Sequence, residues 1–283
     1  GLIEEQIKTQ LYTWQDGRRP NVIGKRDDQG NDLLPTIAEL TPAMVARAIA
    51  SRLDGRYCND KLQQRLGFLT EKENSLAQPR ERLERTPHFC SGCPHNTSTQ
   101  VPEGSRALGG IGCHYMATWM ERGTDTFTQM GGEGVTWLGQ APFTNQKHVF
   151  QNLGDGTYFH SGVLAIRAAI ASGANITYKI LYNDAVAMTG GQPVDGTLTV
   201  QQISHQLYGE GVRRIAVVSD DIDKYPSRAD FADRTTFHHR DDLDALQREM
   251  REIEGCSVII YDQTCAAEKR RRRKRGTMED PNQ

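Results

Sequence analysis

Asp155 and Asn183 are the residues whose type and spacing most clearly suit chemistry. Asp155 follows the apolar run 148–153, and Asn183 follows the run 176–182, 28 residues after Asp155. Both runs predict strands, joined in parallel by a helix expected over 162–172. Because consecutive parallel strands end at one edge of a sheet, these two side chains should lie close together. Their hard oxygens, with glycines flanking Asp155 that leave the backbone open to phosphate, predict a site for Mg²⁺ and a diphosphate.

Four of the six cysteines stand in turn-rich segments, which are typical positions for metal ligands. Cys90 and Cys93 form a CxxC pair, Cys113 follows 20 residues after Cys93, and Cys265 follows 152 residues after Cys113. Thiolates spaced in this way suit a [4Fe-4S] cluster, a structural zinc ion or a redox dithiol. Spacing alone favours the cluster and zinc about equally. Disulfides are not expected, because cytosolic thiols stay reduced.

Composition predicts a water-soluble cytoplasmic protein. The chain has 283 residues, 37% of them hydrophobic, with a net charge of -2 and a mean hydropathy of -0.62. It has no run of about 18 apolar residues, so no membrane span is expected. The start at Gly1 lacks an initiator Met and a secretion signal, which indicates that the natural start lies upstream. The basic run Lys269–Arg275 lacks interleaved aromatic residues, so we interpret it as a solvated linker and expect no nucleic-acid partner.

The order of the elements predicts an α/β fold. From about residue 86, expected strands alternate with helices, which is typical of a doubly wound, mostly parallel sheet. The expected strands are 148–153, 176–182, 214–219 and 257–261, and the expected helices are 162–172, 199–208 and 241–253. Before them lies an N-terminal helical and loop extension, with a loop over 14–36 and a helix over 43–53 that Thr41 and Pro42 begin.

Several motifs together resemble one enzyme family. The sequence Gly154-Asp155-Gly156, followed by Asn183, is similar to the thiamine-diphosphate signature. The segment 183–192 resembles the Mg²⁺ loop of the 2-oxoacid:ferredoxin oxidoreductases. The segment 90–95, CSGCPH, is similar to the CPGCPH of indolepyruvate:ferredoxin oxidoreductases and departs from the pyruvate enzymes, in which Gly commonly follows the second Cys. The segment 3–8 resembles the sequence after the central domain of the indolepyruvate enzymes, in their long fused bacterial forms.

This resemblance implies a set of site residues. Mg²⁺ would be bound by the side chains of Asp155 and Asn183 and the carbonyl of Ala185. A [4Fe-4S] cluster would be bound by Cys90, Cys93, Cys113 and Cys265. The residues that the resemblance places against the cofactor are Ile111, Gly112, Cys113, His114, Met130, Gly131, Gly154, Asp155, Gly156, Thr157, Asn183, Ala185, Ala187 and Met188.

Other side chains near these motifs have two explanations. His160 could be a general acid or a substrate contact, but a histidine satisfied by the helix start is more frequent. His114 suits a cofactor contact and packing equally, and His95 is interpreted as orienting its loop. Four aromatic residues are compatible with an aryl substrate pocket, although an aromatic core is the more frequent explanation: Trp119, Trp137, Tyr158 and Phe159.

The implied activity is oxidative decarboxylation of an aryl 2-oxoacid to acyl-CoA, with electrons passed to ferredoxin. The implied division is a tail of a preceding domain with a linker (1–75), a thiamine-diphosphate-binding domain (76–268) and a basic linker (269–283). The implied partners are ferredoxin, coenzyme A, a 2-oxoacid and the rest of the same polypeptide, with a pyrimidine-binding domain and a ferredoxin-like module. A homo-oligomer is also expected, because thiamine sites usually form between domains or subunits.

Two other functions stay open from the sequence. One is a non-oxidative thiamine-dependent decarboxylase, which would need none of the cysteines. The other is a zinc-stabilised nucleic-acid-binding protein, against which the alternation of strands and helices argues. The carboxylate that activates thiamine diphosphate is expected in another domain, so the catalytic residue is unknown. The isolated chain should therefore bind the cofactor weakly and turn nothing over.

Overall fold

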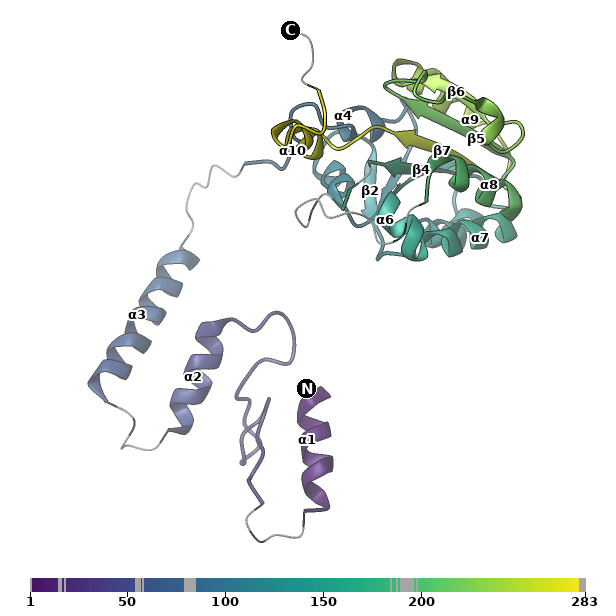
Figure 1. The fold of residues 1–283 in the computed structure, drawn as a ribbon. Coiled ribbons are helices and arrows are strands. Elements are labelled where there is room, and N and C mark those ends of the chain that lie inside the picture. Colours follow the sequence, from purple (N-terminus) through teal and green to yellow (C-terminus); the bar gives the residue numbers. More distant parts are fainter. Residues whose placement is uncertain are drawn as a thin grey trace. The chain divides into compact units, whose positions relative to one another are not determined.

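The computed structural model describes residues 2–14, 17, 19–53, 57, 59–78, 85–183, 185, 186, 188, 196 and 198–279. The chain divides into two compact units, 1–84 and 85–283 (Figure 1).

The first unit is helical, as predicted for the N-terminal extension. Its helices are α1 (Leu2–Tyr12), α2 (Pro42–Arg52) and α3 (Asp60–Ala77). Helix α2 starts where the sequence indicates, because the Thr41 hydroxyl accepts the Met44 N–H and Pro42 occupies the first turn. Helices α1 and α3 were not predicted, and α3 has no buried residue among those described. Their apolar residues therefore form no clear buried stripe that a sequence pattern could reveal.

The second unit is built on a seven-stranded sheet in which every described strand pair is parallel. The strand order is β2-β1-β3-β4-β7-β5-β6. This architecture confirms the predicted doubly wound α/β class. The strands are β1 (Ala107–Gly109), β2 (Thr124–Phe127), β3 (Val149–Gly154), β4 (Ile176–Tyr182), β5 (Arg214–Ser219), β6 (Thr236–His239) and β7 (Cys256–Asp262).

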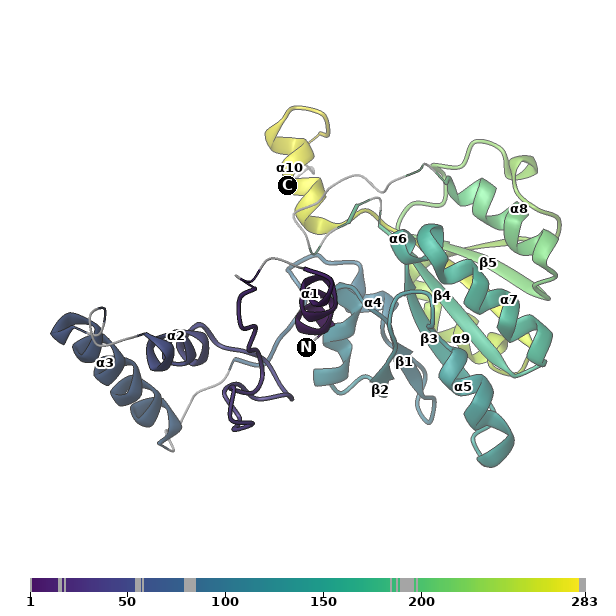
Figure 2. The ribbon, with the colours of Figure 1, turned by 90° about the horizontal axis from the view of Figure 1, so that it is seen from below.

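Helices cover both faces of the sheet (Figure 2). On one face Trp137, Ile166 and Ile203 pack into a core with the central strands. On the other face Leu246 and Met250 pack against strands β4, β5 and β7. Burial from both sides explains why the central strands read as continuous apolar runs. The helices are α4 (His95–Ser98), α5 (Val135–Gln140), α6 (Asp155–Thr157), α7 (Val163–Ser172), α8 (Val200–Glu210), α9 (Leu243–Met250) and α10 (Ala266–Lys274).

The helix after β3 begins earlier than the expected 162–172. Helical structure runs without a break from α6 at Asp155, through a π-helical turn over Tyr158–Gly162, into α7. The π-helical turn packs tightly on β3, because a Cβ on Gly162 would lie 3.0 Å from Leu153. This close approach depends on the position of the sheet, so the local sequence pattern does not predict it. As a result, Asp155 lies in the first helical turn, where backbone N–H groups face a ligand.

Three short strands and several element ends were not predicted. Strands β1, β2 and β6 are three or four residues long, which is too short for a period-2 pattern. His238 and His239 lie half-buried in β6. Helix α8 begins with a capping box between Thr199 and Gln202. Helix α9 is shorter than the expected 241–253, because a short 3₁₀ turn precedes it.

No described helix combines the length and the apolar character needed to cross a membrane. The basic run is in large part helical, since α10 ends at Lys274.

Buried His148 predicts acid sensitivity of the fold. Its ring is 6% exposed, and its Nε2 lies 2.8 Å from the Thr177 hydroxyl. Burial, with a smaller effect of the Arg251 charge, lowers the pKa of His148 to about 4. The unfolded chain therefore binds a proton that the folded chain does not bind between about pH 6.5 and pH 4. Stability is full above this range and falls as the pH decreases through it.

We expect His148→Gln to remove about 1.4 kcal/mol per pH unit from that slope. Glutamine keeps a polar partner for Thr177 but does not titrate. Urea unfolding of both proteins at pH 7, 6 and 5 measures the difference. Equal slopes for the two proteins would contradict the prediction.

Candidate cofactor site

A pocket lies at the carboxyl edge of the sheet, near the ends of β1, β3 and β4. The strand order reverses at β1, since β2 lies on one side of it and β3 on the other. Ligands of open α/β sheets bind at such switch points. The residues that line the pocket are His95, Ile111, Gly112, Cys113, His114, Met130, Gly154, Asp155, Gly156, Thr157, Asn183, Ala185, Val186 and Met188.

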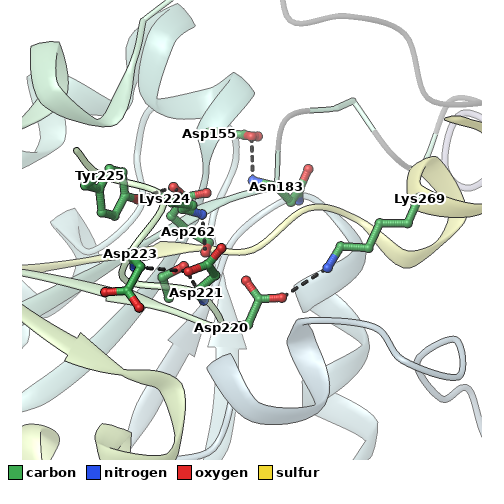
Figure 3. A network of polar contacts seen from close by, with 10 residues as sticks. Asp155, Asn183, Asp220, Asp221, Asp223, Lys224, Tyr225, Asp262 and Lys269 are labelled. Atoms are coloured by element: carbon green, nitrogen blue, oxygen red, sulfur yellow. Dashed lines mark hydrogen bonds and ion pairs between the residues drawn. The ribbon is translucent and has the colours of Figure 1, made fainter. Parts of the chain in front are cut away.

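The Asp155 carboxylate joins the ends of β3 and β4. Its Oδ1 accepts the Gly156 N–H at 2.8 Å, and its Oδ2 accepts the Asn183 N–H at 2.9 Å (Figure 3). The Asn183 Oδ1 accepts the Ala185 N–H at 3.2 Å. The parallel register pairs Gly154 with Leu181, so Asp155 and Asn183 follow adjacent strand ends. Carboxylate and amide oxygens at one lip of a pocket are the donor set that Mg²⁺ prefers, and these residues fit it.

A separate polar network lies at the neighbouring ends of β5 and β7 (Figure 3). Asp262 accepts a hydrogen bond from the Tyr225 hydroxyl and pairs with Lys224 at 2.8 Å. Lys269 of α10 pairs with Asp220 at 3.0 Å. None of these five residues lines the pocket, and the two acidic groups are paired with Tyr225, Lys224 and Lys269.

His114 forms one wall of the pocket. Its ring is 2% exposed and stands against glycines, since a Cβ on Gly112 would lie 2.7 Å from its Cε1 and one on Gly154 would lie 3.6 Å away. Burial, with a smaller effect of His95, lowers the pKa of His114 to about 3. The imidazole is therefore neutral at physiological pH. Glycines here allow the ring to approach the backbone at the strand ends.

Gly110 is required because two polar side chains approach it. A Cβ on Gly110 would lie 2.8 Å from Glu133 Cγ and 3.1 Å from His114 Nε2. We expect Gly110→Ala to lower the free energy of unfolding by about 1–3 kcal/mol, because an extra methyl group in packed surroundings displaces its neighbours. The matched control is Gly139→Ala in α5, where a Cβ meets nothing within 4 Å. Urea unfolding distinguishes the two variants, and equal stabilities would contradict the argument.

Glu133 was not predicted from the sequence to be near the site. Its side chain is fully buried, and its Oε2 accepts the Gly131 N–H at 2.6 Å. Burial raises the pKa of Glu133, while backbone N–H groups lower it. The one signal in the sequence is a carboxylate inside the glycine-rich stretch 131–134, where turn residues would otherwise be expected. Val186 and His95 also line the pocket without having been predicted to contact the cofactor.

Not every predicted cofactor residue lines the pocket. Met130 lines it, but Gly131 does not. His160 is exposed outside the lining, with its Nδ1 2.9 Å from the Ser161 hydroxyl. Ala187 lies outside the described residues, as does most of the predicted Mg²⁺ loop after Met188.

The four aromatic residues fall into two groups. Trp137 and Tyr158 are 1% exposed and belong to the core, where the Trp137 indole N–H donates to Asn175 O and the Tyr158 hydroxyl donates to Gln206. Trp119 and Phe159 are 50% and 40% exposed. The more frequent explanation, an aromatic core, therefore holds for two of the four.

The four cysteines of the predicted cluster influence one another. Burial raises the pKa of the Cys93 thiol to about 11, a hydrogen bond from the His95 backbone opposes this, and Cys113, Cys265 and Cys90 raise it further. Burial, together with Cys265 and Cys90, also raises the pKa of Cys113. All five described cysteines are free thiols.

Within the described ranges, no three His, Cys, Asp or Glu side chains converge to hold a metal ion. Cys113 also lines the pocket, and the Cys265 N–H donates to Asn183 O at 3.1 Å. Cys113 and Cys265 therefore lie beside residues of this pocket.

Residues 110–261 match the family described as thiamine pyrophosphate enzyme, C-terminal TPP binding domain. The match covers more than half of the chain. The chain belongs to this family. Residues 1–79 match the indolepyruvate ferredoxin oxidoreductase middle domain. Together the two matches describe an indolepyruvate-oxidoreductase-like chain with a thiamine-binding domain, which confirms the resemblance at this level.

Curated relatives of this thiamine-binding chain carry one name. It is 28% identical to indolepyruvate oxidoreductase subunit IorA of Thermococcus kodakarensis, over 94% of this chain and 40% of the relative. It is 30% identical to the IorA subunit of Methanothermobacter marburgensis, over 64% of this chain and 28% of the relative. The chain thus spans about 40% or less of these relatives.

A similar solved structure is 2-oxoglutarate:ferredoxin oxidoreductase from Magnetococcus marinus with 2-oxoglutarate, coenzyme A and succinyl-CoA bound. The TM-score is 0.48 and the identity 17%, over 70% of this chain and 67% of that one.

Proposed function

We propose that this chain binds Mg²⁺ and thiamine diphosphate for an enzyme that oxidatively decarboxylates an aryl 2-oxoacid and passes the electrons to ferredoxin. The observation that carries the proposal is the single pocket that gathers Asp155, Asn183 and Ala185 with Cys113 and His114. A binding site for a metal diphosphate thus adjoins a set of four interacting thiols.

The first part of the proposal concerns the cofactor. Asp155 and Asn183 would bind Mg²⁺ through their side chains and Ala185 through its carbonyl, and Gly154 and Gly156 let the backbone approach the diphosphate. When bound, thiamine diphosphate supplies the carbanion and the electron sink for decarboxylation. The helical turn that starts at Asp155 adds N–H groups that favour an anion.

The second part concerns electron transfer. Cys90, Cys93, Cys113 and Cys265 would bind a [4Fe-4S] cluster, which would receive electrons beside the cofactor pocket and deliver them to ferredoxin. The raised pKa values of Cys93 and Cys113 imply that cluster assembly must displace protons, as metal binding to thiols generally does. The curated relatives named as indolepyruvate oxidoreductase subunits support an aryl 2-oxoacid as substrate. Coenzyme A as acyl acceptor rests on the resemblance to the 2-oxoacid:ferredoxin oxidoreductases.

The test combines binding and activity. Calorimetry with the 283-residue chain should show thiamine diphosphate binding only when Mg²⁺ is present. The full enzyme that contains this chain should reduce a low-potential dye when given indolepyruvate and coenzyme A. Release of CO₂ without dye reduction would favour a non-oxidative decarboxylase, and binding that is independent of Mg²⁺ would overturn the proposed site.

A further inference from the structure

Two buried polar atoms without a hydrogen-bond partner face the same glycine. They are Glu133 Oε1 and His114 Nε2, on side chains that are 0% and 2% exposed. Each atom lies 3.1 Å from the position that a Cβ on Gly110 would take. They are therefore at most twice that distance apart, and no hydrogen bond joins them. An unpaired buried polar group costs about 1–3 kcal/mol, so one water or a small movement is expected to connect them.

The Glu133 carboxylate has a fixed orientation. Its Oε2 accepts the Gly131 N–H at 2.6 Å, a short contact of the kind that ionised carboxylates make. The Tyr178 hydroxyl donates to the main-chain oxygen of Glu133 at 2.9 Å, which holds the backbone. With Oε2 engaged, Oε1 is the oxygen that remains on the side of Gly110 and His114.

The His114 ring connects Glu133 to the pocket. Its Nε2 faces Gly110, whereas its Nδ1 lies 2.9 Å from the position of a Cβ on Gly112. Both Gly112 and His114 line the pocket, and Glu133 does not. Glu133 can therefore act on a bound ligand only through the imidazole. In a neutral imidazole one nitrogen donates and the other accepts, and the partner of one nitrogen decides the state of the other.

We propose that Glu133 is a positioning residue: its Oε1 holds the N–H of His114 at Nε2, directly or through one water, so that Nδ1 presents an acceptor to the pocket. A carboxylate attracts the N–H end of the imidazole and repels the lone-pair end. The pocket would then bind a ligand that offers an N–H or O–H group at this point. The identification of that ligand as thiamine diphosphate rests on the proposed function. The position of the proton on the His114 ring does not depend on it.

The experiment is ¹⁵N NMR of the 283-residue chain labelled at its eight histidines, at pH 7.5. A His114→Gln variant assigns the His114 signals. We expect the wild type to carry its proton at Nε2. In Glu133→Gln the Gly131 N–H still requires an acceptor, so the amide NH₂ must face His114 and donate to Nε2. The proton should then move to Nδ1, and affinity for Mg²⁺–thiamine diphosphate should fall roughly tenfold, or about 1.4 kcal/mol.

Two controls separate this from a general structural effect. The signals of His148, whose Nε2 contacts the Thr177 hydroxyl, should not change. Glu252→Gln, at an exposed side chain, should change neither His114 nor the affinity. A wild-type proton at Nδ1, or an unchanged His114 in a folded Glu133→Gln variant, would overturn the inference. The wild-type spectrum decides even if the variant fails to fold. A proton at Nε2 without cofactor binding would support the inference and overturn the proposed function instead.

Discussion

Asp155→Asn is expected to weaken Mg²⁺-dependent binding of thiamine diphosphate roughly 100-fold. The amide removes the charge that faces the metal, and contacts to charged groups contribute about 1.5–3 kcal/mol each. It also leaves one backbone donor unpaired, because the two carboxylate oxygens now accept the N–H groups of Gly156 and Asn183. An amide has a single acceptor oxygen and can satisfy only one of them. Calorimetric titration of the chain with the cofactor and Mg²⁺ measures the loss.

Asp262→Asn is the matched control for this variant. Asp262 ends β7 at the same edge of the sheet, is equally buried at 8% exposure and also accepts hydrogen bonds. Its partners are Tyr225 and Lys224, and it does not line the pocket. Its replacement should lower stability but leave cofactor affinity within about twofold of the wild type. Affinity retained in Asp155→Asn, or lost equally in both variants, would contradict the assignment of the Mg²⁺ site.

Cys113→Ala is expected to abolish assembly of the iron–sulfur cluster. The wild-type chain, reconstituted without oxygen, should bind about four irons and four sulfides, and the variant should bind almost none. Cys113 interacts electrostatically with Cys265 and Cys90 and stands at the boundary between the thiols and the pocket. Without the Cys113 thiolate only three of the four proposed cluster ligands remain. Iron and sulfide analysis, with the visible absorption spectrum, measures the outcome.

Cys256→Ala should keep the cluster, because Cys256 is buried at the start of β7 and is not among the thiols that influence Cys93 and Cys113. Cluster content that survives in Cys113→Ala would show that this residue is not a ligand. Zinc in place of iron in the wild type would favour the structural-metal alternative. A cluster lost in both variants would point to general destabilisation, which urea unfolding would reveal.

The sequence alone predicted those elements whose pattern lies within a few neighbouring residues. The central strands β3, β4, β5 and β7 are buried on both faces, so their apolar runs could be recognised directly. Thr41 and Thr199 mark helix starts because their hydroxyls accept N–H groups three residues later. The closeness of Asp155 and Asn183 also follows from sequence, because parallel strands must end at one edge. The hydrogen bond from the Asn183 N–H to Asp155 agrees with that expectation.

Tertiary structure decided what depends on contacts between distant segments. Strands β1, β2 and β6 are too short to show a period and exist because neighbouring strands pair with them. The spacing of Cys90, Cys113 and Cys265 left cluster and zinc equally favoured, and among the described residues no three of these side chains converge to hold a metal ion.

Glu133 is the clearest example of a residue whose position could not be predicted from the sequence. In the sequence it is a charged residue among glycines, with the pattern of an exposed turn. The fold buries it completely, because the Gly131 N–H and the space beside Gly110 receive its carboxylate, and it places that carboxylate behind His114. Sequence thus determined the fold class and the order of the site residues along the strand ends. Only the packed structure decided which buried polar groups face each other, because that depends on side chains from segments that no local pattern connects.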